Sequence, residues 1–190
     1  MAREQVKRKK GGEPTVLARG TPVRGGALIK DDPWIVLADD EPAPEAGDIV
    51  VSMTRFHAER DALLARGGRL GLTVAPGEAV EAIGEYAKRF ALIMVQFPIF
   101  RDGRGFSTAQ LLRQRYHYRG ELRAVGDVLE DQIFYMLRSG FDAFEILGSD
   151  PLAIYARAAR VFSFGYQPTG DAFVPVHRLR ARRALERAAE

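Results

Sequence analysis

The chain has 190 residues, of which 46% are hydrophobic, so it can bury one substantial core but is too short for a complete eightfold β/α barrel. It contains no cysteine, which excludes disulfides, thiolate nucleophiles and cysteine-ligated zinc or iron–sulfur clusters within the chain. No apolar run approaches the roughly 20 residues of a membrane-spanning helix, and the N-terminus lacks the apolar block of a secretory signal, so we expect a cytoplasmic protein without membrane contact.

The net charge of +3 is unevenly distributed along the chain. Residues 1–14 and residues 177–190 each carry five basic and two acidic residues, so the part between them has a net charge of −3. A nucleic-acid binder usually carries its basic surface on the folded domain. Nucleic acid is therefore a disfavoured partner, and binding through the basic tails is the only form of it that we keep as a hypothesis.

The composition divides the chain into three parts. Residues 1–26 are rich in Lys, Arg, Gly and Pro, which predicts a loose basic tail. Residues 27–170 predict a single α/β domain, and residues 171–190 predict an Arg-rich C-terminal helix or tail.

Regular elements begin after the tail. Residues 27–30 and 34–38 flank Asp31-Asp32-Pro33, which predicts a short β hairpin around an Asp/Pro turn. Apolar runs predict strands at residues 49–53, 69–74, 91–96, 121–125 and 142–146. The segments between them predict helices at residues 55–66 with Thr54 as the cap, from Pro76 to about residue 89, at 107–118 and at 128–139, and another helix opens at Pro151.

This alternation predicts the α/β class. Strands joined by crossover helices form parallel sheets, and the crossovers are almost always right-handed. We expect an open, mostly parallel sheet with helices on both faces, preceded by the hairpin. An incomplete β/α barrel is the alternative.

A glycine-rich loop follows the apolar strand at residues 91–96, where ligands collect in open parallel sheets. Its arginines and the amides of the next helix predict an anion-binding or ligand-binding site. The Ser107 and Gln110 spacing predicts a capping box, and Phe100 and Phe106 are candidates for stacking on a ligand. The alternative is a rigid turn in which Asp102 pairs with Arg104. The candidate residues of this loop are Arg101, Asp102, Gly103, Arg104, Gly105, Phe106 and Ser107.

Asp127 follows the next strand and is predicted to lie beside the glycine loop on the same rim. It suits an N-cap for a helix beginning at Val128, with ligand or metal contact as the alternative. Asp131 and Gln132 extend this polar cluster, and Asp127 and Asp131 are the candidate catalytic carboxylates. The histidines His57, His117 and His177 fall on different elements, so no metal site is predicted.

Charged residues also occur inside a predicted strand. Glu121 and Arg123 alternate on one face of the strand at residues 121–125. Buried charges need partners, so we expect Glu121 to form a structural pair with Arg123 or Arg119 near a sheet edge. Arg113 and Arg115 on the preceding helix point in different directions, so we do not expect both to bind the same ligand.

The segment from Phe97 to Ile146, with the motifs DGRGFS, GELRAVGDVL and GFDAFE, resembles an uncharacterised family of bacterial proteins. Members of this domain-of-unknown-function family are commonly encoded beside sulfite or nitrite reductase genes and are described as oxidoreductases of sulfite reduction. This chain departs from the family at His117, where glycine is usual, and at Ser139, where cysteine is frequent. The family motif directs attention to Asp102, Arg104, Ser107, Arg113, Glu121, Arg123, Asp127, Asp131 and Gln132.

The resemblance implies an accessory protein of assimilatory sulfite reduction that helps electron delivery to sulfite reductase, or assembly of that enzyme. The alternative is a small α/β enzyme acting on an anionic or phosphorylated small molecule, with Asp127 or Asp131 as the base. The residues identify no cofactor.

Overall fold

The computed structural model of the chain describes residues 20–162, 169 and 174–188. Within them, one sheet of eight strands has the order β2-β1-β8-β7-β6-β5-β4-β3. The strands are β1 (Thr21–Arg24), β2 (Ala27–Leu28), β3 (Ile35–Val36), β4 (Ile49–Ser52), β5 (Leu70–Val74), β6 (Leu92–Phe97), β7 (Glu121–Gly126) and β8 (Ala143–Ile146). The helices are α1 (Met53–Ala65), the 3₁₀ helix η1 (Val80–Arg89), α2 (Arg104–Gln110), the π-helical turn η2 (Leu111–Arg115), α3 (Glu130–Ser139), α4 (Pro151–Ala159) and α5 (Val176–Ala188).

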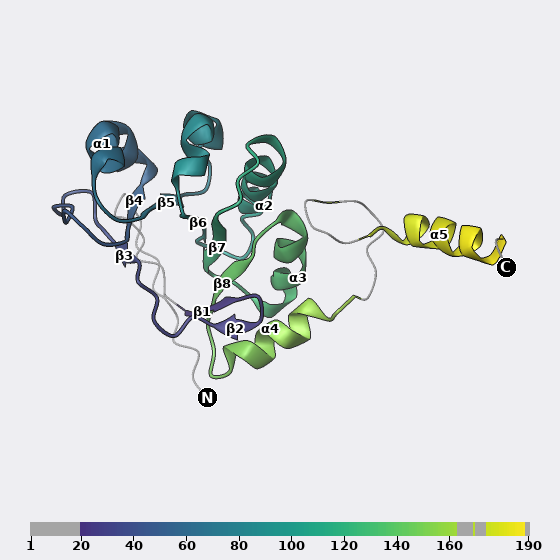
Figure 1. Cartoon of the computed structure of the whole chain (residues 1–190). Helices are drawn as coiled ribbons and strands as arrows, with labels where there is room; N and C mark the ends of the chain where they lie inside the picture. The colour runs from purple at the N-terminus through teal and green to yellow at the C-terminus, as the bar shows by residue number, and fades with distance from the viewer. Residues whose placement is uncertain (1–19, 163–168, 170–173, 189–190) are drawn as a thin grey trace.

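The sheet is mostly parallel and strongly curved. Strands β3 to β8 pair in parallel in chain order, whereas β1 pairs antiparallel with β8 and with β2. Figure 1 shows α1, α2, α3 and α4 along the outer side of the curve. The α/β class and the mostly parallel sheet are therefore confirmed, and the arrangement is the half-barrel alternative, with the helices on the convex face.

The hairpin that precedes the parallel strands is formed by β1 and β2. Its turn is Gly25-Gly26, whose φ angles of 56° and 83° suit the two-residue turns that join twisted strands. The hairpin predicted from residues 27–30 and 34–38 is wrong, because β2 and β3 lie at opposite edges of the sheet. Residues 21–24, which composition assigned to the tail, are a strand, while residues 1–19 of that predicted tail lie outside the described part.

The connection between β2 and β3 runs from one edge of the sheet to the other. Residues 29–34 make this crossing, and six extended residues span only about 20 Å. A flat sheet of eight strands is wider than that, since neighbouring strands lie about 4.8 Å apart. The short connection therefore requires the two edges of the sheet to curl toward each other.

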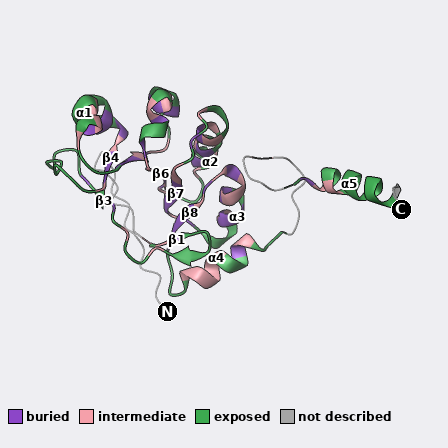
Figure 2. Ribbon diagram, viewed as in Figure 1, coloured by how far each residue is buried: buried purple, intermediate pink, exposed green. Residues whose placement is uncertain are grey.

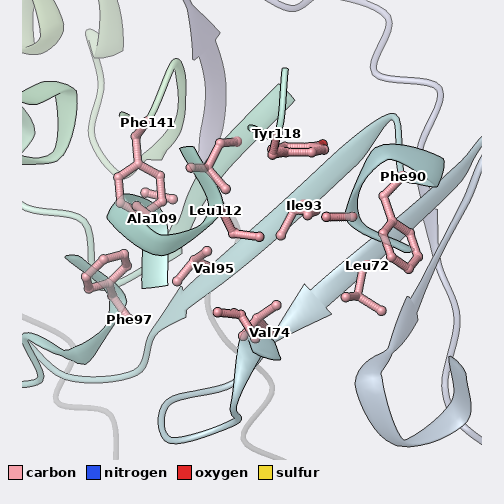
Figure 3. Close-up of a cluster of buried hydrophobic side chains, with 14 of the residues drawn as sticks. Leu72, Val74, Phe90, Ile93, Val95, Phe97, Ala109, Leu112, Tyr118 and Phe141 are labelled. Atoms are coloured by element: carbon pink, nitrogen blue, oxygen red, sulfur yellow. The ribbon is translucent and has the colours of Figure 1, made fainter. Parts of the chain in front are cut away.

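The main core lies between the sheet and its helices. In β6, Ile93, Val95 and Phe97 face the helices and join the large cluster, while Leu92 and Met94 belong to a smaller cluster with other buried residues on the opposite face. Figure 2 shows the buried residues along the strands and the inward sides of the helices, and Figure 3 shows part of the large cluster. Burial of each such side chain contributes about 1.5–3 kcal/mol, so β6 is firmly anchored and positions the loop that follows it.

The starts of α1 and η1 differ from the prediction. Helix α1 is capped by Ser52, whose hydroxyl accepts from the Arg55 N–H at 3.0 Å and donates to Asp39 at 2.6 Å, so the predicted Thr54 cap is wrong. The predicted helix from Pro76 is a 3₁₀ helix that begins only at Val80. None of the helices in the described ranges is both long and apolar enough to cross a bilayer.

Candidate functional site

The loop between β6 and α2, residues 98–103, is attached to the segment that follows β7. The carboxylate of Asp127 accepts a hydrogen bond from the Phe100 N–H at 3.0 Å, and the Asp127 N–H donates to the Phe97 carbonyl at 2.7 Å. Gln132 Nε2 donates to the Phe100 carbonyl at 3.1 Å. The glycine loop and Asp127 therefore lie side by side at the carboxyl ends of two neighbouring parallel strands, as the alternation of strands predicted.

Asp127 holds the loop and does not cap the helix. Helix α3 begins at Glu130 with Leu129 as its N-cap residue, and no side chain makes a capping hydrogen bond there. The predicted cap for a helix beginning at Val128 is wrong because the chain first turns at Gly126, whose φ is 100°. This turn directs the Asp127 side chain toward the loop after β6.

Arg104 is paired with Asp102 inside the loop. Arg104 Nε donates to Asp102 Oδ1 at 2.9 Å and a terminal nitrogen donates to Oδ2 at 2.6 Å. These hydrogen bonds keep the pKa of Asp102 below its ordinary value and raise that of Arg104. The rigid turn is thus present, yet 62% of the Arg104 side chain is exposed, so its guanidinium also faces solvent at the rim.

The two glycines of the DGRG segment have different surroundings. A Cβ on Gly105 would lie 2.5 Å from the ring of Phe97, so Gly105 allows α2 to pack closely on β6 and does not face a ligand. Gly103 has open space where its Cβ would be. Gly103 is also the N-cap residue of α2, which places Ser107 inside the helix and makes the predicted capping box wrong.

The remaining candidates of the loop divide between core and surface. Phe106 is partly buried and meets Phe97 edge to face at 5.5 Å between ring centroids, so it belongs to the core. Phe100 is 47% exposed, and Arg101 and Asp131 are exposed as well. Only Phe100 of the two aromatic candidates is therefore available for contact with another molecule.

Exposed apolar residues follow three neighbouring strands at this end of the sheet. They lie in the loops after β6, β7 and β8, and their exposed fractions range from 40% to 54%. Of these residues only Phe100 was predicted from the sequence, although all of them are large apolar residues in loop positions. We call this group the rim patch, which consists of Ile99, Phe100, Leu129 and Leu147.

Arg113, which the family motif singles out, supports the structure below this rim. Its guanidinium donates to the carbonyls of Gly140, Tyr118 and Gly120 at 2.8–2.9 Å. Burial lowers the pKa of Arg113, and the nearby carboxylate of Asp142 opposes this effect. Arg113 therefore joins η2 to the starts of β7 and β8 and is remote from the glycine loop.

Arg123 is fully buried on the concave face in the middle of the sheet. It pairs with Glu121 at 2.7 Å, with Asp32 at 2.6 Å and with Glu145 at 3.6 Å. Burial alone would lower the pKa of Arg123, but its hydrogen bonds to Asp32 and Glu121 raise it. The predicted pair with Glu121 is confirmed, whereas its predicted place near an edge is wrong, because β7 is flanked by β6 and β8.

The cluster around Arg123 fastens the crossing segment. Asp32 belongs to residues 29–34, so its ion pair with Arg123 connects that segment to the middle of the sheet across 91 positions of sequence. Within the described ranges there is no group of three or more acidic, histidine or cysteine side chains arranged to hold a metal ion.

A family model described as a bacterial protein of unknown function (DUF934) matches residues 71–177, which include the glycine loop, Asp127 and the rim patch. No curated protein matches the chain.

Proposed function

The chain belongs to a family of bacterial proteins of unknown function (DUF934), and we propose that it is an accessory protein of assimilatory sulfite reduction that docks on sulfite reductase through the rim patch. The proposed role is to assist electron delivery to the reductase or its assembly. The proposed pathway is supported by the resemblance to this family, whose members are commonly encoded beside sulfite reductase genes. The docking surface comes from the geometry of the rim.

The observation that carries the docking proposal is the fixed loop that presents Ile99 and Phe100. Both backbone polar groups of Phe100 are bonded to side chains after β7, while its own side chain remains 47% exposed. An apolar group that is held in place before binding loses little conformational freedom when a partner covers it. Grouped exposed apolar residues mark interaction sites more often than isolated ones do.

The charge beside the rim patch specifies the partner further. Arg101 is exposed and forms no ion pair among the described residues, and Arg104, at the start of α2, is 62% exposed although it is paired with Asp102. Aromatic residues and arginine are the types enriched at protein interfaces. A complementary surface would be apolar at its centre with carboxylates at its border. Such a surface on sulfite reductase is what the proposal requires.

A binding role also agrees with the composition. The chain has no cysteine, so it has no thiol pair or thiolate-bound cluster of its own to carry electrons. The proposal therefore assigns it the task of bringing other redox components together.

A pair of matched isoleucines tests the docking surface. Ile99 on the rim and Ile35 in β3 are both 54% exposed, and β3 is three strands away from β6 in the sheet order. Binding to purified sulfite reductase should weaken about tenfold or more in Phe100→Ala and severalfold in Ile99→Ala, because central apolar anchors carry most of an interface's energy. Ile35→Ala should bind within about twofold of the unchanged protein.

The binding measurement should be made by titration calorimetry under oxidising and reducing conditions. Absence of association in both, or equal binding by Phe100→Ala and the unchanged protein, would reject the docking proposal. The enzyme alternative has its own test in thermal unfolding with sulfite and phosphate. A stabilisation by either anion that Arg104→Ala removes would favour an enzyme acting on an anionic substrate.

A further inference from the structure

A hollow of about 380 Å³ lies at the opposite end of the sheet from the rim patch. It is formed where the end of η1 meets the connection from η2 to β7, and these segments are adjacent because the Glu121 N–H donates to the Ala91 carbonyl at 3.0 Å. The residues that line it are Lys88, Phe90, His117, Tyr118, Arg119 and Gly120.

Three of the lining side chains can present positive charge or N–H donors to one ligand. Lys88, His117 and Arg119 are all exposed, and none of them forms an ion pair with a carboxylate in the described part of the chain. Glu121, the acidic residue that follows this connection, is already bonded to Arg123 and Arg24. The positive charge around the hollow is therefore not neutralised locally.

A second hollow nearby shows the contrasting case. It is lined by Arg66, Arg69 and Arg89 among other residues. Arg69 is paired with Asp48, and Arg66 donates to the carbonyls of Pro44 and Gly47. Two of its three arginines thus support the structure, whereas no such contact occupies the basic groups of the first hollow.

His117 has an unusual backbone conformation. Its φ is 52°, and among the described residues it is the only one other than glycine with a positive φ. Glycine adopts this conformation without steric cost, so a histidine side chain here is held at the expense of stability. Backbone strain of this kind is concentrated at binding and active sites.

The floor of the hollow is rigid and uncharged. Phe90 and Tyr118 are buried, and Figure 3 shows both in the packed cluster around Ile93. The Tyr118 hydroxyl donates to the Glu121 carbonyl at 2.9 Å, and burial raises the pKa of this phenol well above its ordinary value. The floor therefore adds no negative charge that would oppose an anion.

We propose that the hollow between η1 and the η2–β7 connection binds a phosphate-type oxyanion, either free or as the head group of a small organic ester. The Lys88 ammonium and the Arg119 guanidinium supply the charge, and the imidazole of His117 supplies an N–H donor. The site is independent of the docking surface at the other end of the sheet. Binding of the oxyanion does not require docking on sulfite reductase.

Titration of the full chain with inorganic phosphate at neutral pH, followed by amide chemical shifts, tests the site. We expect saturable binding whose affinity falls at least fivefold in Lys88→Ala and in Arg119→Ala. Arg89→Ala is the matched control, because Arg89 is the exposed neighbour of Lys88 on η1 but lines the other hollow, and it should bind within twofold. Chemical shift changes that do not saturate, or an equal loss of phosphate affinity in Lys88→Ala and Arg89→Ala, would overturn the site. Either result would mean that phosphate is attracted only by the general positive charge of the surface.

His117→Gly provides a variant that should be more stable than the unchanged chain. Because glycine relieves the positive φ, its midpoint of thermal unfolding should rise while the phosphate affinity falls. A variant that binds phosphate with unchanged affinity would overturn the role of His117. Phenyl phosphate then distinguishes the two possible ligands. Tighter binding than that of inorganic phosphate assigns an organic ester, and equal binding assigns the free anion. In both cases Lys88→Ala and Arg119→Ala should weaken the binding.

Discussion

The side chain of Asp127 bonds the backbone N–H of Phe100 at 3.0 Å, across 27 positions of sequence. Gln132 bonds the carbonyl of the same residue, so the segment after β7 grips both polar groups of Phe100. The loop that carries the exposed ring of Phe100 is consequently held in place by the segment that follows β7. This relationship connects the topology of the sheet with the surface proposed for docking.

Replacement of Asp127 should loosen that loop. Asp127→Ala removes the acceptor of the Phe100 N–H, and a lost hydrogen bond of this kind costs about 1 kcal/mol of the free energy of unfolding. Asp127→Asn keeps an oxygen acceptor and should recover most of this loss. Hydrogen exchange of the Phe100 amide checks the cause, because it should accelerate in Asp127→Ala and change little in Asp127→Asn. Equal exchange in all three proteins would mean that the bond does not hold the loop.

The two glycines of the DGRG segment should respond to the same substitution with losses of different size. Gly105→Ala places a methyl group against the ring of Phe97, and overpacking of this kind costs about 1–3 kcal/mol. Gly103→Ala meets open space at a φ of −84°, which any residue adopts, and should change the free energy of unfolding by less than about 0.5 kcal/mol. Urea denaturation of the two variants measures both, and equal losses would contradict the close packing of α2 on β6.

Strands β4 to β8 could be predicted because each is a short apolar run next to a helical segment. β7 is one residue longer than the predicted strand at 121–125, and β8 is one residue shorter than the predicted strand at 142–146. The first strand, β1, could not be found in this way. Only Val23 of its four residues is buried, and its partner β8 lies about 120 positions further along the chain.

The candidate site was partly predictable for a related reason. Parallel strands end at a common edge, so Asp127 and the glycine loop were expected to meet, and they do. The partners of the charged residues inside β7 could not be predicted fully, because one of them is distant in the sequence. Arg123 is paired with Asp32, which reaches it only because residues 29–34 cross the concave face. The N-cap expected at Asp127 failed because two further residues precede α3.

Arg113 should be more important for stability than its position on a partly exposed turn suggests. Arg113→Ala leaves the carbonyls of Gly140, Tyr118 and Gly120 without this donor, and we expect a loss of about 3 kcal/mol or more in the free energy of unfolding. Arg113→Lys should recover less than half, since one ammonium group cannot reproduce the planar fork. Arg115→Ala, on the same turn, is the control and should cost less than about 1 kcal/mol.

Chemical denaturation at neutral pH compares these three variants. Full recovery by lysine would show that charge alone is needed at this position. A loss in Arg115→Ala as large as that in Arg113→Ala would show that the turn itself, and not the three carbonyl contacts, sets the stability.

Asp48 should contribute to the stability of the protein only while it is ionised. Hydrogen bonds from Arg69 to both of its carboxylate oxygens lower its pKa below the ordinary value of 3.8, against the smaller opposing effect of burial. A lowered pKa in the folded state means that the folded chain favours the carboxylate. The contribution is therefore fully present above about pH 5 and is lost as the pH falls through the lowered value.

Asp48→Asn should be less stable than the unchanged protein by about 1–2 kcal/mol at neutral pH, and this difference should shrink below about pH 4. Urea titrations across this range measure the difference, with Asp61→Asn as the control because the Asp61 side chain is 91% exposed and its ion pair with Arg60 contributes little. A difference for Asp48→Asn that stays constant or grows as the pH falls would contradict the ion pair with Arg69 as its source.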